Sequence, residues 1–505
     1  MGGFQVLKNP QDDKTTSTTS PPESKKGFST TSPSRSTYRT SPNGSKRPWP
    51  RRNQQFSSAK HDRVKDRKKK FHLAQFLVHG PTYHSLAMWR HPRTDWTEDS
   101  WRKPELYQHI AQVCERGLFD TVFFADLNYI SDSYKGSLEP ALRYATQAPE
   151  HDPIPLLTMI AAVTKHVGLG ATFSVSYQHP FYAARLWATL DHLTGGRAAW
   201  NMVTSLNQNQ ATNYGQANLE PSELRYEKAH EFIEVCQQLW NSWDEDAVVM
   251  DRQNAVFADA SKVRRIEYEG RHYSSRGPLN VVRSPQIGPA LLQAGTSPKG
   301  IDLAAKYADA VFAINPRVEE AATYYSKLKG RVSDLGRDPD HCAVLFGAQP
   351  IIGSSEVEAL EKQEEHNSLV PLEGGMTILS GHLNFDLSKL SPGDEMMSRT
   401  EPELQRSRRV YQKDNGDSMT VKEVAQRHGE SVGLPQFVGT PASVADQLEA
   451  FFDKVGGDGF MLSPIYNPGA IEEFVDLVIP ELQRRGRFRT AYTGTTQRDH
   501  FRQVE

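Results

Sequence analysis

The stretch RLWATLDHLTGGRAAWNMVTS, Arg185 to Ser205, contains a helix, a turn and a strand in succession. Its first half carries leucines at helical spacing, which predicts an apolar helix face formed by Leu186, Leu190 and Leu193. Asp191 is expected to point away from that face. Gly195 and Gly196 end the helix. The short apolar run that follows ends in a polar cluster formed by Asn201, Thr204 and Ser205.

The same alternation of apolar runs and helical patterns extends from Phe71 to about residue 490. Continuous apolar runs separated by helices are typical of a buried parallel sheet. Eight such units favour a (β/α)₈ barrel over an open doubly wound sheet, and no Gly-x-Gly-x-x-Gly follows an early strand. The predicted strands lie near residues 72–78, 121–125, 168–175, 197–204, 289–294, 309–314, 341–350 and 458–463.

Two segments interrupt this alternation. Residues 245–285 are predicted as an irregular excursion with a small hairpin, and residues 365–435 as an insertion before the last strand. Excursions of this kind are common above the mouth of a barrel and often cover the site.

The composition divides the 505 residues into a tail and a body. The first 70 residues hold 17 Lys and Arg against 5 Asp and Glu, which leaves 42 basic and 56 acidic residues for the remainder. Residues 1–70 are therefore predicted as a disordered basic tail, residues 71–490 as the folded domain and residues 491–505 as a C-terminal tail. The run RVKDRKKK, Arg63 to Lys70, fits a nuclear-localisation or nucleic-acid patch as well as a solvated linker. Nothing in the body resembles a nucleic-acid module, which favours the linker.

Several classes of protein and of site are disfavoured. Three scattered cysteines do not make a disulfide framework, and no apolar run approaches the roughly 20 residues of a membrane span. No secretory signal begins the chain, so we expect a soluble, cytoplasmic protein. The histidines follow no metal-binding spacing, so no metal site is expected. Ser174 and Ser205 lack the Gly-x-Ser-x-Gly pattern of hydrolases.

Polar residues follow the strands at the end where a barrel carries its active site. They are Asp126, Thr172, Ser174, Asn201, Thr204, Ser205, Thr296, Ser297 and Asn315. In GTSPKG, Ser297 and Pro298 open a helix, whose free N–H groups suit a phosphate. Ser297 fits a plain helix cap equally well. At Thr440, which also opens a helix, a plain cap is favoured.

The segment HPFYAARLWATLDHLTGGRAAWNMVTS resembles the signature of the nitrilotriacetate monooxygenase component A family, flavin-dependent monooxygenases of the bacterial luciferase-like superfamily. Further matching segments follow in family order: GLFDTVFFAD, LRYEKAHEFIEVCQQLWNSW, GPALLQAGTSPKGIDLAAKYADAVFA and FVGTPASVADQLEAFF. The resemblance covers roughly residues 71–490 and implies a (β/α)₈ barrel.

The resemblance implies reduced FMN as cofactor, supplied by a separate NAD(P)H-dependent flavin reductase, with O₂ as co-substrate. It also implies a small-molecule substrate and a homodimer or homotetramer. Asp126 matches the acidic residue beside the isoalloxazine ring, and Thr172 a hydroxyl residue that contacts the ring or its chain. Residues on the phosphate side are Tyr226, Thr296 and Ser297. Ser222 stands where the family usually has His, which puts that one contact in doubt.

The resemblance indicates the residues that would contact the substrate less clearly than those that would contact the flavin. The luciferase-like fold places substrate-side groups beyond the first strand, so His79, Trp89 and His91 are the catalytic candidates, although a packed loop explains them as well. The leading hypothesis is a two-component FMN-dependent monooxygenase. The alternatives are a flavin- or F420-dependent oxidoreductase of the same superfamily that transfers no oxygen, and a catalytically lapsed flavin-binding barrel.

Overall fold

The computed structural model describes residues 69–95, 99–405, 411–413 and 416–502. The basic tail predicted for residues 1–70 lies outside the described residues, apart from Lys69 and Lys70. Among the described helices, none combines the length and the hydrophobicity that crossing a lipid bilayer requires.

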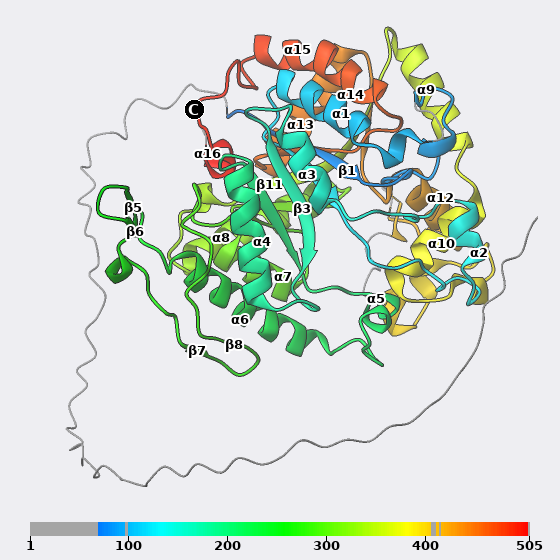
Figure 1. The fold of residues 1–505 in the computed structure, drawn as a ribbon. Helices are drawn as coiled ribbons and strands as arrows, with labels where there is room; N and C mark the ends of the chain where they lie inside the picture. Colours follow the sequence, from blue (N-terminus) through cyan, green and yellow to red (C-terminus); the bar gives the residue numbers. More distant parts are fainter. Residues whose placement is uncertain (1–68, 96–98, 406–410, 414–415, 503–505) are drawn as a thin grey trace, which may run out of the picture. The chain divides into compact units, whose positions relative to one another are not determined.

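The eight predicted strands form a closed parallel barrel (Figure 1). Around the barrel the order is β1, β2, β3, β4, β9, β10, β11 and β13, and β13 pairs with β1 to close the ring. The prediction of a (β/α)₈ barrel is confirmed. The strands are β1 (His72–Val78), β2 (Thr121–Ala125), β3 (Gly168–Ser174), β4 (Ala198–Val203), β9 (Ala290–Gln293), β10 (Ala310–Ala313), β11 (Ala343–Ile352) and β13 (Gly459–Leu462).

The interior of the barrel is filled with side chains. Phe123 of β2 and Phe312 of β10 meet with ring centroids 4.6 Å apart, although their strands are not neighbours. A Cβ at Gly170 of β3 would lie 3.3 Å from Leu292 Cδ1 and 3.4 Å from Phe123. Glycine at this position therefore makes room for the large side chains opposite. Ligands must bind at one end of the barrel and not inside it.

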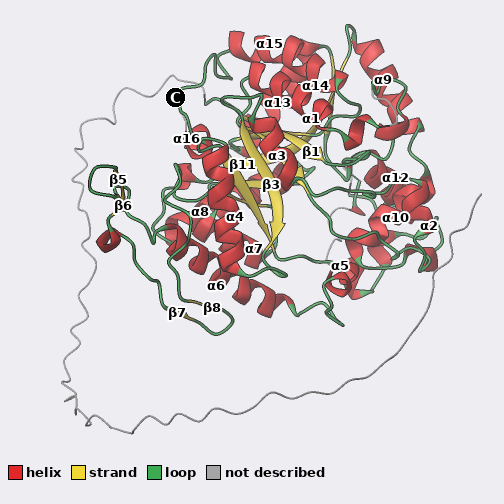
Figure 2. Ribbon diagram, viewed as in Figure 1, coloured by secondary structure: helices red, strands yellow, loops and turns green. Residues whose placement is uncertain are grey.

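Helices surround the barrel (Figure 2). The Pro298–Tyr307 helix predicted from the sequence is α7, whereas the helix predicted over Val318 to Leu328 continues to Asp334 as α8. The helices outside the insertion are α1 (Pro104–Arg116), α2 (Glu139–Arg143), α3 (Ile154–Ala161), α4 (Pro180–Leu193), α5 (Gln208–Asn213), α6 (Ser222–Trp240), α7 (Pro298–Tyr307), α8 (Val318–Asp334), α13 (Pro441–Val455), α14 (Gly469–Glu473), α15 (Ile479–Arg484) and α16 (Gln497–Arg502).

Helix α4 is rotated relative to the face predicted from its leucines. Leu193 is 62% exposed, whereas Asp191 is fully buried and accepts hydrogen bonds from the backbone N (2.9 Å) and Nε2 (2.7 Å) of Gln286. The buried face holds Leu190, alanines and Trp187, whose indole stacks on Trp200 of β4 at 5.9 Å, and Leu186 is partly buried against the core. The leucine-based prediction is therefore confirmed for Leu190 and in part for Leu186, and is wrong for Leu193 and Asp191, because small side chains with a weak apolar signal make up much of the face.

The two excursions have the predicted locations. Residues 245–285 carry the predicted hairpin, β7 (Tyr268–Glu269) with β8 (Ser274–Ser275), and a second one, β5 (Val248–Asp251) with β6 (Val256–Ala258). The insertion is helical and has its own hydrophobic cluster. A short ninth strand of the sheet, β12 (Gln436–Gly439), pairs in parallel with the end of β11 and was not predicted. The helices of this region are α9 (Glu356–Ser368), α10 (Leu372–Leu383), α11 (Pro402–Gln405) and α12 (Val421–Ser431).

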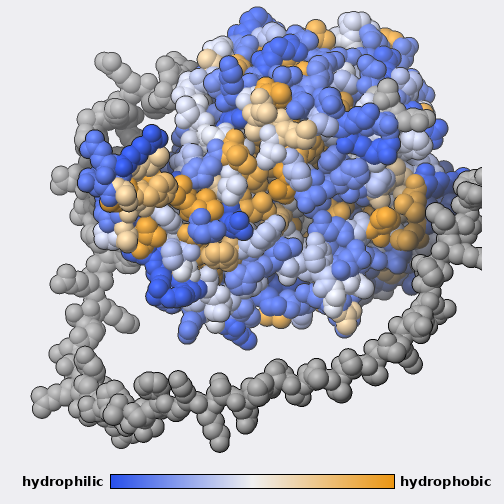
Figure 3. Space-filling view, viewed as in Figure 1, coloured by the Kyte–Doolittle hydropathy of each residue, from blue (hydrophilic) through white to orange (hydrophobic). Residues whose placement is uncertain are grey.

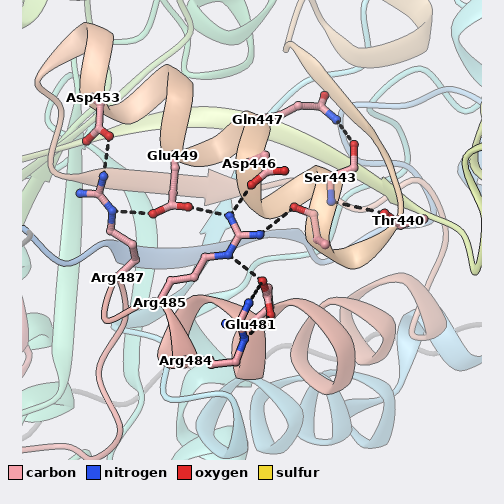
Figure 4. A network of polar contacts seen from close by, with 11 residues as sticks. Thr440, Ser443, Asp446, Gln447, Glu449, Asp453, Glu481, Arg484, Arg485 and Arg487 are labelled. Atoms are coloured by element: carbon pink, nitrogen blue, oxygen red, sulfur yellow. Dashed lines mark hydrogen bonds and ion pairs between the residues drawn. The ribbon is translucent and has the colours of Figure 1, made fainter.

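The C-terminal region packs against the amino-terminal end of the barrel. Helix α16 lies within the segment predicted as a C-terminal tail, yet Gln497 is fully buried. A Cβ at Gly168, the first residue of β3, would collide with the Gln497 amide. Next to α15, Arg485 and Arg487 both bind Glu449 of α13 (Figure 4), at 2.6 Å and 2.7 Å.

Three aspartates stand immediately before strands, and each carboxylate accepts a hydrogen bond from the backbone N–H of the neighbouring strand. Each bond fixes the register of two strands where they enter the barrel. The pairs are Asp120 with Leu73 (2.8 Å), Asp309 with Leu291 (2.9 Å) and Asp458 with Val344 (2.8 Å).

Each of these carboxylates also contacts basic side chains from elsewhere in the chain. They are Arg489 and His72 at Asp120, Arg498 and Arg502 at Asp309, and Lys69 and Lys329 at Asp458. Burial raises the pKa of Asp120, but Arg489 and His72 outweigh it and hold that pKa at about 2. The buried charge is thus fully paired, as a buried ion must be.

Replacing Asp120 with Asn should lower the free energy of unfolding at pH 7 by about 3–5 kcal/mol, because Arg489 then stays buried without a counter-charge. The folded pKa of Asp120 is depressed, so in the wild type its contribution is present above about pH 4 and is lost as the pH falls towards 2. Urea unfolding at pH 7 and pH 3 measures both effects. Asp302→Asn, in an exposed ion pair with Arg331, is the control and should cost at most about 1 kcal/mol. An Asp120→Asn loss no larger than that of the control would contradict the role given to this carboxylate.

Candidate active site

The polar residues that end β3 and β4 lie together at the carboxyl-terminal end of the barrel. Nδ2 of Asn201 donates to Oγ1 of Thr172 (3.0 Å), and the hydroxyls of Ser174 and Ser205 are 2.8 Å apart. Within the described part of the chain, Oδ1 of Asn201 is buried and has no hydrogen-bond partner. An unpaired buried acceptor marks a place where a ligand donor fits.

The mouth of the barrel next to these residues is open to solvent. Ile314, directly after β10, is 37% exposed, and Ala294 and Thr296 after β9 are exposed as well. Nδ2 of the neighbouring Asn315 is buried and unpaired among the described residues. The mouth therefore offers apolar contact surface together with isolated polar atoms, the usual composition of a small-molecule site.

Two carboxyl groups lie after β2. Asp126 is half-buried, and its Oδ2 accepts a hydrogen bond from Nδ2 of Asn128 (2.7 Å). Burial raises the pKa of Asp126 to about 6. Glu150 accepts a hydrogen bond from the backbone N of Leu127 (2.8 Å), and burial together with the nearby Asp126 raises its pKa well above the ordinary value. A raised carboxyl pKa in an open site is a signature of function.

The predicted phosphate residues also come together. Oγ of Ser297 caps α7 by accepting a hydrogen bond from the backbone N of Gly300 (3.1 Å), and it lies 3.4 Å from the Tyr226 hydroxyl of α6. Ser297 and Thr296 are both exposed, and Ser222 lies one turn before Tyr226 on α6. Ser297 is thus a cap that remains accessible, and the cluster presents hydroxyl groups at a helix N-terminus, where an anion is stabilised.

His79 lies at the end of β1 but packs towards helix α1. Its ring is edge-to-face with those of Tyr107 (5.2 Å) and His151 (4.9 Å), and its Nδ1 lies 3.3 Å from the carbonyl oxygen of Asp152. Burial lowers its pKa. These contacts favour a packing role for His79.

The other two catalytic candidates lie in the loop after β1. Trp89 is 43% exposed. His91 is buried between Tyr466 (4.9 Å) and His366 (6.0 Å), and burial lowers its pKa to about 4. His91 is therefore an uncharged side chain held against the insertion.

A cluster of histidines that the sequence analysis did not identify connects the barrel mouth to the insertion. His84 stacks on Phe76 of β1 (3.6 Å), and its Nδ1 lies 3.2 Å from the Ser463 hydroxyl after β13. Nδ1 of His382 in α10 lies 2.8 Å from Nε2 of His428 in α12. Burial lowers the pKa of His84 to about 3 and that of His382 to about 4. No short motif marks these residues, because they lie far apart in the sequence. Within the described ranges, no group of His, Cys, Asp or Glu side chains has the geometry of a metal site.

A stacked tyrosine pair also escaped the sequence analysis. The rings of Tyr177, after β3, and Tyr214, after α5, are parallel at 4.2 Å. The Tyr214 hydroxyl donates to Oδ1 of Asn128 (3.1 Å), the residue that binds Asp126. The loops after β2, β3 and β4 are thereby joined into one wall.

Comparison with known proteins identifies the family of the chain. Residues 105–459 match the luciferase-like monooxygenase family. The chain belongs to this family. It is 42% identical over 441 residues to the dibenzothiophene-sulfone monooxygenase of Rhodococcus erythropolis (strain XP), covering 86% of this chain and 96% of that protein. It is 37% identical to nitrilotriacetate monooxygenase component A of Aminobacter aminovorans, over 78% and 89% of the two chains.

A solved structure is similar throughout. The riboflavin lyase RcaE, crystallised with modified FMN and riboflavin, has a TM-score of 0.78 at 27% identity, and the match covers 86% of this chain and 96% of that one. The resemblance inferred from the sequence motifs is confirmed. The relatives are monooxygenases, so the chain is placed among oxidoreductases.

Replacing Asp126 with Asn should raise the free energy of unfolding at pH 7 by up to about 3 kcal/mol, because the buried charge is removed. The folded pKa is raised, so the ionised wild-type side chain costs stability above about pH 4, with the full cost present above about pH 6. The gain should therefore shrink as the pH is lowered from 7 to 5. Urea unfolding at both pH values measures it. Asp476→Asn, in an exposed ion pair with Arg116, is the control. A destabilised Asp126→Asn variant would show that the carboxylate is a structural group.

Proposed function

We propose that this luciferase-like protein is the oxygenating component of a two-component system that uses reduced FMN and O₂ to oxygenate a small organic molecule. The observation that carries the proposal is the meeting, at one barrel mouth, of a raised-pKa carboxyl and an exposed hydroxyl cluster at a helix N-terminus. These two features suit the ring and the phosphate of one flavin. The names of two relatives support the proposal: both are monooxygenases, and one of them is named as component A.

The residues present fit FMN. The phosphate would be held by Thr296, Ser297 and Tyr226 with the free N–H groups of α7, and Ser222 takes the place of the usual His on the same side. The ring would face Asp126 and Thr172, and the unpaired Oδ1 of Asn201 would accept from a ring N–H. When bound, reduced flavin supplies the electrons that activate O₂ for transfer of one oxygen atom to the substrate. The insertion lies beside the mouth, where α10 and the residue after it contact the loop that follows β4, and it would limit the water that reaches the reacting groups.

A separate reductase would supply the reduced flavin. The sequence carries no Gly-x-Gly-x-x-Gly after an early strand, so nothing in it indicates a dinucleotide site of its own. We place the enzyme in the cytoplasm, with a flavin reductase as a transient partner.

A homo-oligomer is also part of the proposal. Apolar side chains gather around the β5–β6 hairpin and α4 (Figure 3). The exposed ones are Val249 (50%), Met250 (56%), Phe257 (62%) and Leu193 (62%). A second copy of the chain would remove this apolar surface from water.

Anaerobic titration of the full chain with reduced FMN, followed by rapid mixing with O₂, tests the proposal. The change Tyr226→Phe should weaken reduced-FMN binding about tenfold, because it removes one hydrogen bond to a charged phosphate. Tyr182→Phe, at an exposed position of α4, is the matched control and should bind like the wild type.

The outcomes separate the candidate functions. Binding of reduced FMN, with substrate-dependent incorporation of ¹⁸O from ¹⁸O₂ into the product, would support the monooxygenase. Binding without oxygen incorporation, but with substrate-dependent oxidation or reduction of the flavin, would favour an oxidoreductase that transfers no oxygen. Binding with neither reaction would favour the catalytically lapsed flavin-binding barrel, and failure of reduced FMN to bind would contradict the proposal.

A further inference from the structure

Arg225, near the start of α6, is a buried arginine at the carboxyl-terminal end of the barrel. It is 8% exposed. Its Nε donates to the carbonyl oxygen of Glu220 (2.9 Å), and its Nη1 donates to the carbonyl oxygens of Thr204 (3.1 Å) and Ser205. The guanidinium is therefore held in one place by the loop that follows β4 and by the segment that leads into α6.

The remaining nitrogen of this guanidinium is free. Among the described residues, Nη2 of Arg225 has no hydrogen-bond partner, and it is not fully enclosed by the protein. Arg197, just before β4 at the opposite end of the barrel, is a useful comparison. It is 4% exposed, and each of its N–H groups has an acceptor, from Ala161, Thr164, Val167 or Thr194. An arginine that only holds loops together is thus fully satisfied in this chain, whereas Arg225 keeps an edge that a ligand can take.

The charge of Arg225 has no carboxylate partner. Within the part of the chain that the structure describes, no Asp or Glu forms an ion pair with it, because Glu220 binds Lys228 and Glu223 binds Lys299. Burial lowers the pKa of Arg225, but an arginine remains protonated. A buried charge without a counter-charge is costly, and an anionic ligand would offset that cost.

Arg225 also stands beside the residues proposed for the phosphate. It precedes Tyr226, whose hydroxyl lies 3.4 Å from Oγ of Ser297 after β9. Arg225 itself reaches the loop after β4, and β4 pairs with β9. A Cβ at Gly300 would lie 3.3 Å from the Tyr226 hydroxyl, so the glycine leaves room for that group at the start of α7. The two side chains thus reach neighbouring strand ends from one turn of α6, where the phosphate is proposed to lie.

Resting on the proposed function, we infer that Arg225 supplies the positive charge of the phosphate site. Its Nη2 donates to the phosphate of FMN, while Nε and Nη1 keep the guanidinium in place. Hydroxyl groups and the N-terminus of α7 offer only partial charges, whereas a guanidinium matches phosphate oxygens in both charge and geometry. Arg225 thereby sets the preference of the chain for FMN over riboflavin, which has the same ring system and no phosphate.

Reduced FMN and reduced riboflavin are the matched probes, titrated anaerobically into the full chain. The wild type should bind FMN at least about tenfold more tightly than riboflavin. Arg225→Gln should weaken FMN binding about tenfold or more, the effect of a lost charged hydrogen bond, and should change riboflavin binding by less than about threefold. The ratio of the two dissociation constants measures the preference and requires no turnover.

Arg197→Gln is the matched control, because it removes another buried arginine that binds carbonyl oxygens without a carboxylate. It should lower the melting temperature and leave the flavin preference unchanged. Arg225→Lys takes the place of Arg225→Gln if a melting curve shows that the glutamine variant does not fold. A lysine lacks the planar fork and cannot bind the loop carbonyls and the phosphate at once, so the FMN preference should fall about threefold or more.

Three results would overturn the inference. Equal weakening of both flavins in Arg225→Gln would show that Arg225 only holds the loops. A wild type that binds riboflavin as tightly as FMN would show that no charge recognises the phosphate. An Arg225→Lys variant that keeps the full FMN preference would show that the bridging fork is not used.

The two proposals fail differently. An FMN preference that depends on Arg225, without incorporation of oxygen from O₂, would leave the phosphate contact standing while the proposed function falls. Oxygen incorporation together with an unchanged FMN preference in Arg225→Gln would support the proposed function and overturn the phosphate contact.

Discussion

The barrel depends on charged hydrogen bonds at its amino-terminal end. Asp120, Asp309 and Asp458 each precede a strand and bind the backbone of the neighbouring strand. A carboxylate that accepts a backbone N–H and is paired with a cation makes a short, strong contact. Because parallel strands share one direction, fixing register at this end also fixes which residues reach the other end.

This arrangement separates stability from function along the barrel axis. At the amino-terminal end the three aspartates are paired with basic side chains, and the Gln497 amide fills the space beside Gly168 without a hydrogen-bond partner among the described residues. At the carboxyl-terminal end, Asn201 and Asn315 keep polar atoms unpaired, and Asp126 carries a charge that burial disfavours. Unpaired polar atoms and a disfavoured charge lower the free energy of unfolding, as is common at a site that a ligand completes. The paired amino-terminal end offsets this loss.

The insertion places uncharged histidines beside the mouth of the barrel. It brings His382 and His428 from two helices to His84 of the first loop, and burial keeps all three uncharged. Uncharged histidines offer hydrogen bonds without attracting ions. Residues outside the eight strands thus line the surroundings of the mouth in a fold that serves many reactions.

The eight strands could be predicted because each is a continuous apolar run, and burial on both faces requires that pattern. Asp126, Thr172, Thr296 and Ser297 could be located because the end of a strand is visible in the sequence. A parallel barrel places the ends of all its strands at one mouth, so the prediction of a barrel also predicts that these residues lie at the same end. The face of α4 could not be predicted, since alanines and a buried Asp191 carry little apolar periodicity. Strand β12 was not predicted because Gln436 and Val438 are only half-buried, so the strand is not the continuous apolar run by which β9, β10 and β13, of the same length, were found.

The sequence by itself determined the barrel, the order of its elements and the polar residues at the strand ends, because these depend on local apolar patterns. The tertiary structure alone decided the raised pKa of Asp126 and the neutral histidine cluster. Those properties arise from burial and from contacts between residues as far apart as Gln147 and His382, and no local pattern in the chain records them.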